Sequence, residues 1–348
     1  MMLKRRILLN TVSGHKVDIS EKSPNFHMIL CGISGIGKSV CMQKNELQSA
    51  KSGSTVIALD INGSREQNQI FDHIKMEYSS LVNWIDVRRD GVDLRFLEPL
   101  YGCDGRGEDF VRVVESAVSA LSTSQRFGSR QIAALRDAII FAMKHGKKFP
   151  DEITSIGVGL LQQDDSTAKG VYERLWTVFN QRIFRRSNAS LHAGMINIVS
   201  FTDMEDVSKR VYLDIILAYL WRVIRYQGYA MGGEIMISID EFQNIHTGEG
   251  SVIRDMLREG RKFGLGLMLA TQTLSTFPKA TQAILNQAGI RIFFRQAANE
   301  IRDVAGMIDP IDRERWVSVL TSLRVGEAVA VGNFEVNGNE VNHPIIVT

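Results

Sequence analysis

A glycine-rich turn between residues 32 and 39 ends in a lysine and a serine, directly after a short apolar run. Gly32, Gly37, Lys38 and Ser39 have the spacing of a Walker A motif, in which glycines let backbone N–H groups point inward at phosphates. Lys38 would reach the β- and γ-phosphates, and Ser39 would ligate Mg²⁺. The predicted nucleotide-binding residues are Gly32, Ser34, Gly35, Ile36, Gly37, Lys38 and Ser39. A glycine turn with a solvated lysine is the less favoured alternative, because a strand precedes this turn and a helix follows it.

A pair of acids ends a second apolar run much later in the chain. Residues 234–241 read Glu-Ile-Met-Ile-Ser-Ile-Asp-Glu, which is the pattern of a Walker B element. Asp240 would hold Mg²⁺ through water, and Glu241 would polarise the attacking water. A strand that simply ends in surface acids is the alternative. The position of the acids after a phosphate-binding loop, in a chain that alternates strands and helices, favours an ATP-hydrolysing enzyme.

Two other polar residues stand at the ends of predicted strands. Gln272 follows the apolar run 265–270, where its amide would contact the γ-phosphate or the lytic water and couple nucleotide state to movement. Asp60 ends the apolar run 54–59, at the strand end where ligands bind to parallel sheets. In the sequence Asp-Ile-Asn-Gly it would equally serve as a turn or N-cap residue, so both interpretations of Asp60 stay open.

The elements that would position these residues alternate between strands and helices. Residues 1–25 predict a short extension with a hairpin, whose strands lie near 6–9 and 16–19. Further strands are expected at 26–31, 54–60, 82–87, 195–201, 234–240, 265–270, 289–294, 327–331 and 343–347. Helices are expected at 38–52, 206–226, 251–261, after Pro278 and from Asn299, and a turn at 228–233 leads into the Walker B strand.

Residues 109–188 differ from the rest, because apolar residues recur there at helical spacing. We therefore predict an α-helical insertion at 109–188, within an α/β core formed by 26–108 and 189–348. Arginines of the insertion would face DNA or a neighbouring subunit, or would form a solvated helical face, which is the more common outcome. These arginines are Arg126, Arg130, Arg136, Arg182, Arg185 and Arg186.

The composition is that of an ordinary globular protein, with 348 residues of which 44% are hydrophobic and 23% charged. A net charge of +2 neither supports nor excludes a nucleic-acid partner. Cys31, Cys41 and Cys103 are too few for a disulfide framework and lack metal-ligand spacing, which suits a reducing cytosol. No run approaches the ~18 apolar residues that a membrane span needs. We expect a cytoplasmic protein without a membrane anchor of its own.

The Walker A motif, the Walker B element and the stretch 258–272 together resemble the HerA–FtsK superfamily of ring-forming, DNA-pumping ATPases. Residues 60–63 (Asp-Ile-Asn-Gly), 290–295 and 323–330 are similar to segments of HerA and its conjugation-ATPase relatives, in the same order. Ser64 departs from the pattern, because an acid usually follows that glycine. The resemblance covers about residues 25–348. It implies a RecA-like P-loop NTPase core with a mostly parallel sheet and an α-helical insertion.

The resemblance also implies roles for individual residues. Glu241 would be the catalytic glutamate and Gln272 the sensor of nucleotide state. An arginine of 258–261 would reach into the neighbouring subunit's ATP, where charge on the γ-phosphate oxygens needs a positive group. We favour Arg261 over Arg258, and the alternative for either is a cation that stabilises a helix C-terminus.

The activity implied by the resemblance is an ATP- and Mg²⁺-dependent homo-hexameric motor that translocates double-stranded DNA. HerA proteins commonly carry an N-terminal β-barrel, whereas only about 25 residues precede the P-loop strand here. A separate nuclease or effector protein, in DNA processing or antiphage defence, would therefore complete the system. The alternative is an ATP-dependent oligomeric scaffold that activates a partner effector without processive translocation.

Overall fold

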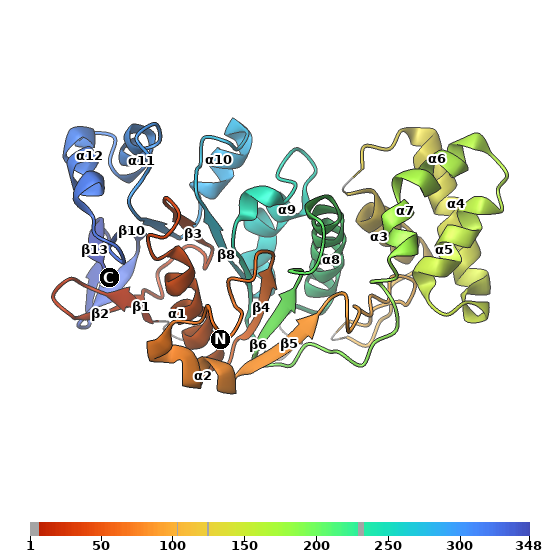
Figure 1. Ribbon diagram of the computed structural model, residues 1–348, viewed down its shortest axis with the longest axis horizontal. Helices are drawn as coiled ribbons and strands as arrows, with labels where there is room; N and C mark the ends of the chain where they lie inside the picture. The colour runs from red at the N-terminus through yellow and green to blue at the C-terminus, as the bar shows by residue number, and fades with distance from the viewer. Residues whose placement is uncertain (1–6, 103, 124, 229–232) are drawn as a thin grey trace.

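A nine-stranded sheet forms the centre of the molecule (Figure 1). The computed structural model describes residues 7–102, 104–123, 125–228 and 233–348. The strands are β3 (Met28–Cys31), β4 (Thr55–Asp60), β5 (Val82–Asp86), β6 (Ile196–Ser200), β7 (Ile235–Ile239), β8 (Leu265–Thr271), β9 (Ile290–Phe293), β10 (Ala328–Gly332) and β13 (Ile345–Val347). Their order is β13-β10-β9-β3-β8-β7-β4-β6-β5, with antiparallel pairing only where β10 meets β9 and β13. The predicted mostly parallel α/β sheet is confirmed.

The central strands are apolar throughout because both faces of the sheet are covered. Every residue of β3, β4, β6, β7 and β8 is buried. Alternate side chains of β3 enter two different cores: Ile29 packs with the cluster that includes the helical insertion, whereas Met28 and Leu30 pack with the cluster that includes α1 (Lys38–Lys51). Continuous apolar runs of this kind are typical of parallel strands with helices on both sides.

The helices outside 109–188 follow the predicted order. Besides α1 they are α2 (Lys75–Ser80), α8 (Asp206–Gln227), α9 (Val252–Glu259), α10 (Lys279–Leu285), α11 (Ile301–Ile308) and α12 (Arg313–Ser322). The helix expected at 251–261 is shorter than predicted: α9 ends at Glu259, and a 3₁₀ turn occupies Gly260–Phe263. Gly260 weakens the helix at this point, and Gly264 with a φ of 73° ends it. Neither the short helix α2 nor the separate helix α12 was predicted.

Five helices fill the predicted insertion, and Figure 1 shows them grouped at the end of the molecule beyond β5. They are α3 (Phe110–Ser122), α4 (Ser129–His145), α5 (Glu152–Leu161), α6 (Ser166–Arg174) and α7 (Trp176–Asn180). Aspartates at positions 109, 151 and 165 begin α3, α5 and α6 by accepting hydrogen bonds from backbone N–H groups. The polar segment 162–167 separates α5 from α6, as the sequence indicated. That 109–188 is a unit of its own stays a prediction.

A second, four-stranded sheet has the order β1-β2-β11-β12. It joins β1 (Ile7–Asn10) and β2 (Lys16–Ile19) to β11 (Phe334–Val336) and β12 (Asn339–Val341). The first hairpin matches the prediction, whereas the second was not predicted. Three earlier expectations fall partly or wholly outside the described residues: the strand start at Arg6, the thiol of Cys103 and most of the turn at 228–233. Among the helices of the described ranges, none is long and apolar enough to span a bilayer.

Candidate nucleotide-binding site

The glycine-rich turn connects β3 to α1, and its conformation requires glycine at two positions. Gly37 has a φ of 112°, a value that other residues rarely adopt. At Gly32, an added Cβ would lie 2.6 Å from the Cβ of Phe294. Ser34 and Gly35 are exposed, whereas the Ile36 side chain is buried in the core beside α1. The turn is thus anchored in the core by Ile36, and its residues Ser34 and Gly35 face solvent before the start of α1.

Lys38 points back into the turn. Its Nζ donates hydrogen bonds to the carbonyl oxygens of Gly32, over 2.7 Å, and Ile33, over 2.9 Å. Burial lowers the pKa of Lys38, and the nearby carboxylates of Asp240 and Glu241 act in the opposite direction. The Lys38 ammonium group, surrounded by the backbone of the turn, is placed to contact phosphate oxygens bound at the N-terminus of α1.

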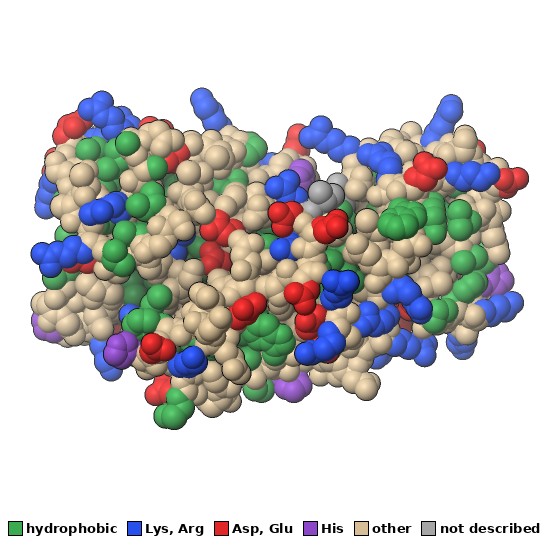
Figure 2. All heavy atoms as spheres, viewed as in Figure 1, with side chains coloured by type: hydrophobic (Ala, Val, Ile, Leu, Met, Phe, Trp, Pro, Cys, Tyr) green, Lys and Arg blue, Asp and Glu red, His purple; other side chains and the backbone are tan. Residues whose placement is uncertain are grey.

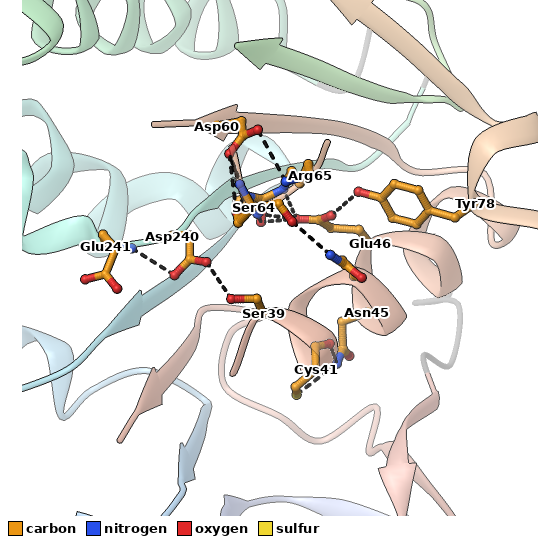
Figure 3. A network of polar contacts seen from close by, with 12 residues as sticks. Ser39, Cys41, Asn45, Glu46, Asp60, Ser64, Arg65, Tyr78, Asp240 and Glu241 are labelled. Atoms are coloured by element: carbon orange, nitrogen blue, oxygen red, sulfur yellow. Dashed lines mark hydrogen bonds and ion pairs between the residues drawn. The ribbon is translucent and has the colours of Figure 1, made fainter. Parts of the chain in front are cut away.

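Ser39 meets the first acid of the Walker B element (Figure 3). The Ser39 hydroxyl donates a hydrogen bond to Asp240 Oδ2 over 2.8 Å, and Asp240 Oδ1 accepts one from the backbone N–H of Glu241 over 2.9 Å. A hydroxyl and a carboxylate side by side are the hard oxygen donors that Mg²⁺ uses. No cluster of three or more His, Cys, Asp or Glu side chains suited to a metal occurs among the described residues. The Ser39 hydroxyl and the Asp240 carboxylate fit an ion that takes its other ligands from phosphates and water.

Glu241 occupies an uncommon backbone conformation and is held by two glutamines. Its φ of 54° and ψ of 48° are left-handed, a strained state for a non-glycine residue. Gln272 Nε2 donates to Glu241 Oε1 over 3.0 Å, and Gln243 Nε2 donates to Glu241 Oε2. Thr271 Oγ1 in turn donates to Gln243 Oε1 over 2.9 Å. Sequence reasoning missed Gln243, because it lies on the short 3₁₀ turn 242–244 rather than at a strand end.

The register of the sheet explains why these residues meet. Cys31 of β3 pairs with Thr271 of β8, and Ile239 of β7 pairs with Leu269 of β8. The carboxyl ends of three neighbouring parallel strands therefore lie at one edge, where ligands bind in α/β proteins. The phosphate-binding turn, the two acids and Gln272 all follow these strand ends. The structure thus brings together the Walker A and Walker B residues and Gln272.

Comparisons with known proteins identify similar folds. No family model matches the chain. A probable helicase of Methanocaldococcus jannaschii is 24% identical over 347 residues, covering 88% of this chain, which spans only 60% of the helicase. VirB4 of Thermoanaerobacter pseudethanolicus superposes with a TM-score of 0.72 at 14% identity, over 99% of this chain and 96% of VirB4. The plasmid coupling protein TrwB with a non-hydrolysable ATP analogue gives 0.66 at 14% identity, over 100% of this chain and 90% of TrwB.

The chain has the RecA-like P-loop ATPase fold of VirB4 and TrwB. Each of these two proteins is matched over nearly its whole length. The resemblance inferred from the sequence is confirmed at the level of the fold. Identities near 14% leave the roles of individual residues to be argued from the geometry of this site.

The two arginines that the superfamily resemblance singles out lie outside the site within one chain. Arg258 is in the last turn of α9, and Arg261 is in the 3₁₀ turn that follows. Both side chains are exposed, and neither forms a side-chain hydrogen bond or ion pair with another described residue. The structure therefore does not bring either arginine to Glu241 of its own chain.

Asp60 follows the turn interpretation. Its carboxylate is fully buried and accepts hydrogen bonds from the backbone N–H groups of Ser64, over 3.0 Å, and Arg65, over 3.3 Å. Burial raises the pKa of Asp60, and the Arg65 guanidinium opposes that rise. Asp60 thus shapes the turn after β4 that contains Ser64 and Arg65.

Arg65 links this turn to the two Walker elements (Figure 3). Its Nη2 donates to Glu46 Oε1 of α1 over 2.6 Å and to Ser238 Oγ of β7 over 2.8 Å. The Tyr78 hydroxyl donates to Glu46 Oε2 over 2.5 Å. Burial alone would raise the pKa of Glu46, but the charge and hydrogen bonds of Arg65 hold it below its usual range. This buried network joins the helix that follows Lys38 to the strand that precedes Asp240.

Proposed function

We propose that this chain is a ring-forming ATPase that uses ATP hydrolysis to translocate DNA. The proposal is carried by one observation: the Ser39–Asp240 pair and the Gln272–Glu241 pair adjoin the phosphate-binding turn at a single sheet edge. The comparisons add support, since the relative is named a probable helicase and TrwB a plasmid coupling protein. TrwB has also been solved with ADP and Mg²⁺, which suits the cofactors proposed for this chain.

Each residue of the site has a separate role in ATP hydrolysis. Backbone N–H groups of the turn and the Lys38 ammonium bind the phosphates, and Ser39 with Asp240 would hold Mg²⁺ against them. Glu241 accepts a proton from the attacking water as the oxygen bonds to the γ-phosphorus and the ADP oxygen leaves. Gln272 and Gln243 fix the orientation of the Glu241 carboxylate. Breaking or keeping the hydrogen bond between Gln272 and Glu241 would couple the nucleotide state to the position of β8.

Completion of the site by a neighbouring subunit is part of the proposal. Arg261, or else Arg258, would enter the adjacent subunit's site and stabilise charge on the transferring phosphoryl group. A closed hexamer gives each site such a neighbour, and the nucleotide would then also control how subunits contact each other. A separate nuclease or effector acting with the ring, in DNA processing or antiphage defence, and a cytoplasmic location complete the proposed system.

ATP turnover with and without DNA tests the proposal. We expect Mg²⁺-dependent hydrolysis that double-stranded DNA stimulates, together with displacement of a triplex-forming strand from a DNA track. A rate of ATP hydrolysis that no form of DNA changes would overturn the proposed translocation and favour the ATP-dependent scaffold that activates a partner. Absence of hydrolysis with purified oligomer would overturn the ATPase assignment itself.

A further inference from the structure

Five arginines from two separate segments gather where β5 ends. They are Arg88, Arg89, Arg182, Arg185 and Arg186, here called the arginine patch. Four of them are exposed, and Arg185 is partly buried. Figure 2 shows Lys and Arg side chains concentrated below the helical insertion, over the region where Figure 1 places the end of β5. The sequence alone does not bring residues 88–89 and 182–186 together.

Arg185 holds the two segments side by side. Its Nη1 donates to the carbonyl oxygen of Arg182 over 2.8 Å, and its Nη2 donates to those of Arg88, over 3.1 Å, and Arg89, over 2.7 Å. An added Cβ on Gly91, which has a φ of 77°, would lie 2.8 Å from Arg185 Cγ. The Arg185 guanidinium thus joins the two segments, and the other four arginines are exposed on the surface beside it.

The acids near the patch are used within a turn. Asp86 Oδ1 accepts hydrogen bonds from the backbone N–H groups of Arg88, over 2.9 Å, and Arg89, over 2.8 Å. Asp90 Oδ2 accepts one from the Asp86 N–H over 2.9 Å, and Asp90 also pairs with the Arg89 side chain. These bonds orient the acids toward the turn's own backbone. Asp86 and Asp90 together offset the charges of Arg88 and Arg89, so the remaining excess of positive charge comes from the other segment.

Arg182 and Arg186 are the available cations. Neither side chain forms a hydrogen bond or ion pair with another described residue. Arg182 also has a φ of 52°, a left-handed conformation that few non-glycine residues adopt. Holding an arginine in this conformation costs folding energy, which is a feature of sites where side-chain direction matters.

The surface around the patch is polar. Protein-binding patches usually contain large apolar or aromatic anchors. Within the described residues 86–90 and 181–190 no large apolar side chain is exposed, and the other exposed residues are Gln181, Asn188 and Ser190; the exposed Leu191 follows directly. Guanidinium groups match phosphate oxygens with two parallel hydrogen bonds, and amide and hydroxyl side chains also contact the backbone of nucleic acids.

We propose that the arginine patch binds the phosphate backbone of DNA. This inference rests on the proposed DNA-motor function and names the surface on which that motor holds its substrate. Contacts with phosphates position DNA without selecting a sequence, as a translocating protein requires. The patch lies at the junction of the sheet and the helical insertion, so DNA bound there would touch both parts of the chain.

The test compares DNA binding by wild type and the double variant Arg182→Glu/Arg186→Glu. Fluorescence anisotropy with a labelled 30-base-pair duplex, without nucleotide and with a non-hydrolysable ATP analogue, would be repeated over a range of salt concentrations. We expect the double variant to bind at least about tenfold more weakly, and the slope of log affinity against log salt to become shallower by about two. The matched control is Arg315→Glu, an exposed arginine on α12 at the opposite end of the molecule (Figure 1).

The outcomes separate this inference from the proposed function. Equal binding and equal salt slopes in wild type, double variant and control would overturn the patch while leaving the DNA motor intact. Failure of the wild type to bind any DNA would overturn both. Binding to phosphatidylglycerol vesicles but not to duplex, lost in the double variant, would replace DNA by an anionic membrane surface. If the double variant does not fold, photo-crosslinking of the wild type to a bromodeoxyuridine-containing duplex replaces it. Peptides spanning 86–90 and 181–187 should then carry the crosslinks. Crosslinks found only in other peptides would overturn the patch.

Discussion

Gln272 at the end of β8 donates a hydrogen bond to Glu241 at the end of β7, over 3.0 Å between Nε2 and Oε1. The two residues belong to neighbouring strands that pair in parallel, so a small shift of one strand end changes the orientation of the carboxylate. Gln243 holds the other carboxylate oxygen. Both partners of Glu241 are themselves held: Gln272 directly follows β8, and Gln243 accepts a hydrogen bond from Thr271. A carboxylate held in this way is suited to orienting one water molecule.

We expect Glu241→Gln to bind ATP with near-normal affinity and to lose about 10²- to 10⁴-fold in turnover. The amide keeps the size of the side chain and tolerates the same left-handed backbone, but it cannot accept a proton from water. Binding of a fluorescent ATP analogue and steady-state phosphate release measure the two quantities separately. The control is Glu249→Gln, an exposed acid of the following loop, which should match wild type. Wild-type turnover by Glu241→Gln would show that another residue is the base.

Gln272→Glu should move the acid limb of the pH–rate profile to higher pH. In this variant two carboxylates face each other across the present hydrogen bond, and their repulsion favours a proton bound between them. Turnover therefore falls more at pH 6 than at pH 9 relative to wild type. Gln272→Ala removes the hydrogen bond without adding charge, so it should lower turnover without moving the limb upward. The idea that Gln272 acts directly on Glu241 fails if both variants shift the profile equally.

The sequence was sufficient for those parts of the site that depend on neighbouring residues along the chain. The Walker A spacing fixes the turn and the start of α1, and the acids at 240–241 follow from the end of an apolar run. Parallel sheets bring strand ends to one edge, so the meeting of Gln272 with Glu241 could also be expected. The choice between ligand and turn residue for Asp60 could not be made, because it depends on the backbone N–H groups of Ser64 and Arg65 folding back onto the carboxylate.

Other features depended on contacts that no local pattern reveals. The arginine patch joins residues far apart in the chain through Arg185 and backbone carbonyls, and Gln243 acts from a short 3₁₀ turn. The missed hairpin β11–β12 is different, because its signal was present. Asn337 and Gly338, with φ values of 51° and 79°, form the Asn-Gly turn that is typical of two-residue hairpins. The strands on either side were too short to be recognised by periodicity.

The stability of the protein should depend on pH through Glu152 at the start of α5. Burial raises the pKa of this carboxyl group to about 7, from an ordinary value of 4.5. Between these two pH values the folded state binds more protons than the unfolded state, so this group's contribution lowers the free energy of unfolding as pH rises. Above pH 7 the full cost of a buried carboxylate is present. Glu152→Gln removes that cost.

We therefore expect Glu152→Gln to be more stable than wild type at pH 8, on the order of 2 kcal/mol, with the difference vanishing near pH 4. Urea unfolding at both pH values measures it. Comparison with wild type isolates this group from His27, whose pKa burial lowers to about 4 and which acts in the opposite direction between pH 4 and 6.5. An equal difference at both pH values would mean that packing or hydrogen bonding of Glu152, rather than its ionisation, is responsible.

Because Arg261 is exposed, we can test whether it completes the nucleotide-binding site of a neighbouring subunit. If Arg261 enters a neighbour's site, Arg261→Ala should bind nucleotide nearly as wild type does but lose turnover, because its effect arises when charge develops in the transition state. The rate should fall about 10³-fold or more. Lys262→Ala, which removes the adjacent exposed cation, is the matched control and should remain active. Arg258→Ala is tested alongside, since Arg258 is the second candidate.

Mixing two inactive proteins then shows whether the arginine acts between subunits. Lys38→Ala subunits lack the ammonium that meets the phosphates but keep Arg261, whereas Arg261→Ala subunits keep Lys38. Mixed rings contain some interfaces at which an intact Lys38 site faces an intact Arg261, so part of the activity should return after subunit exchange. Mass measurement with ATP bound gives the ring size in the same samples. Rapid turnover by a stable monomer would exclude both the ring and the arginine's action in trans. Full activity of Arg261→Ala alone would transfer the role to Arg258, and mixtures that stay inactive despite exchange would place Arg261 in its own helix end as a stabilising cation.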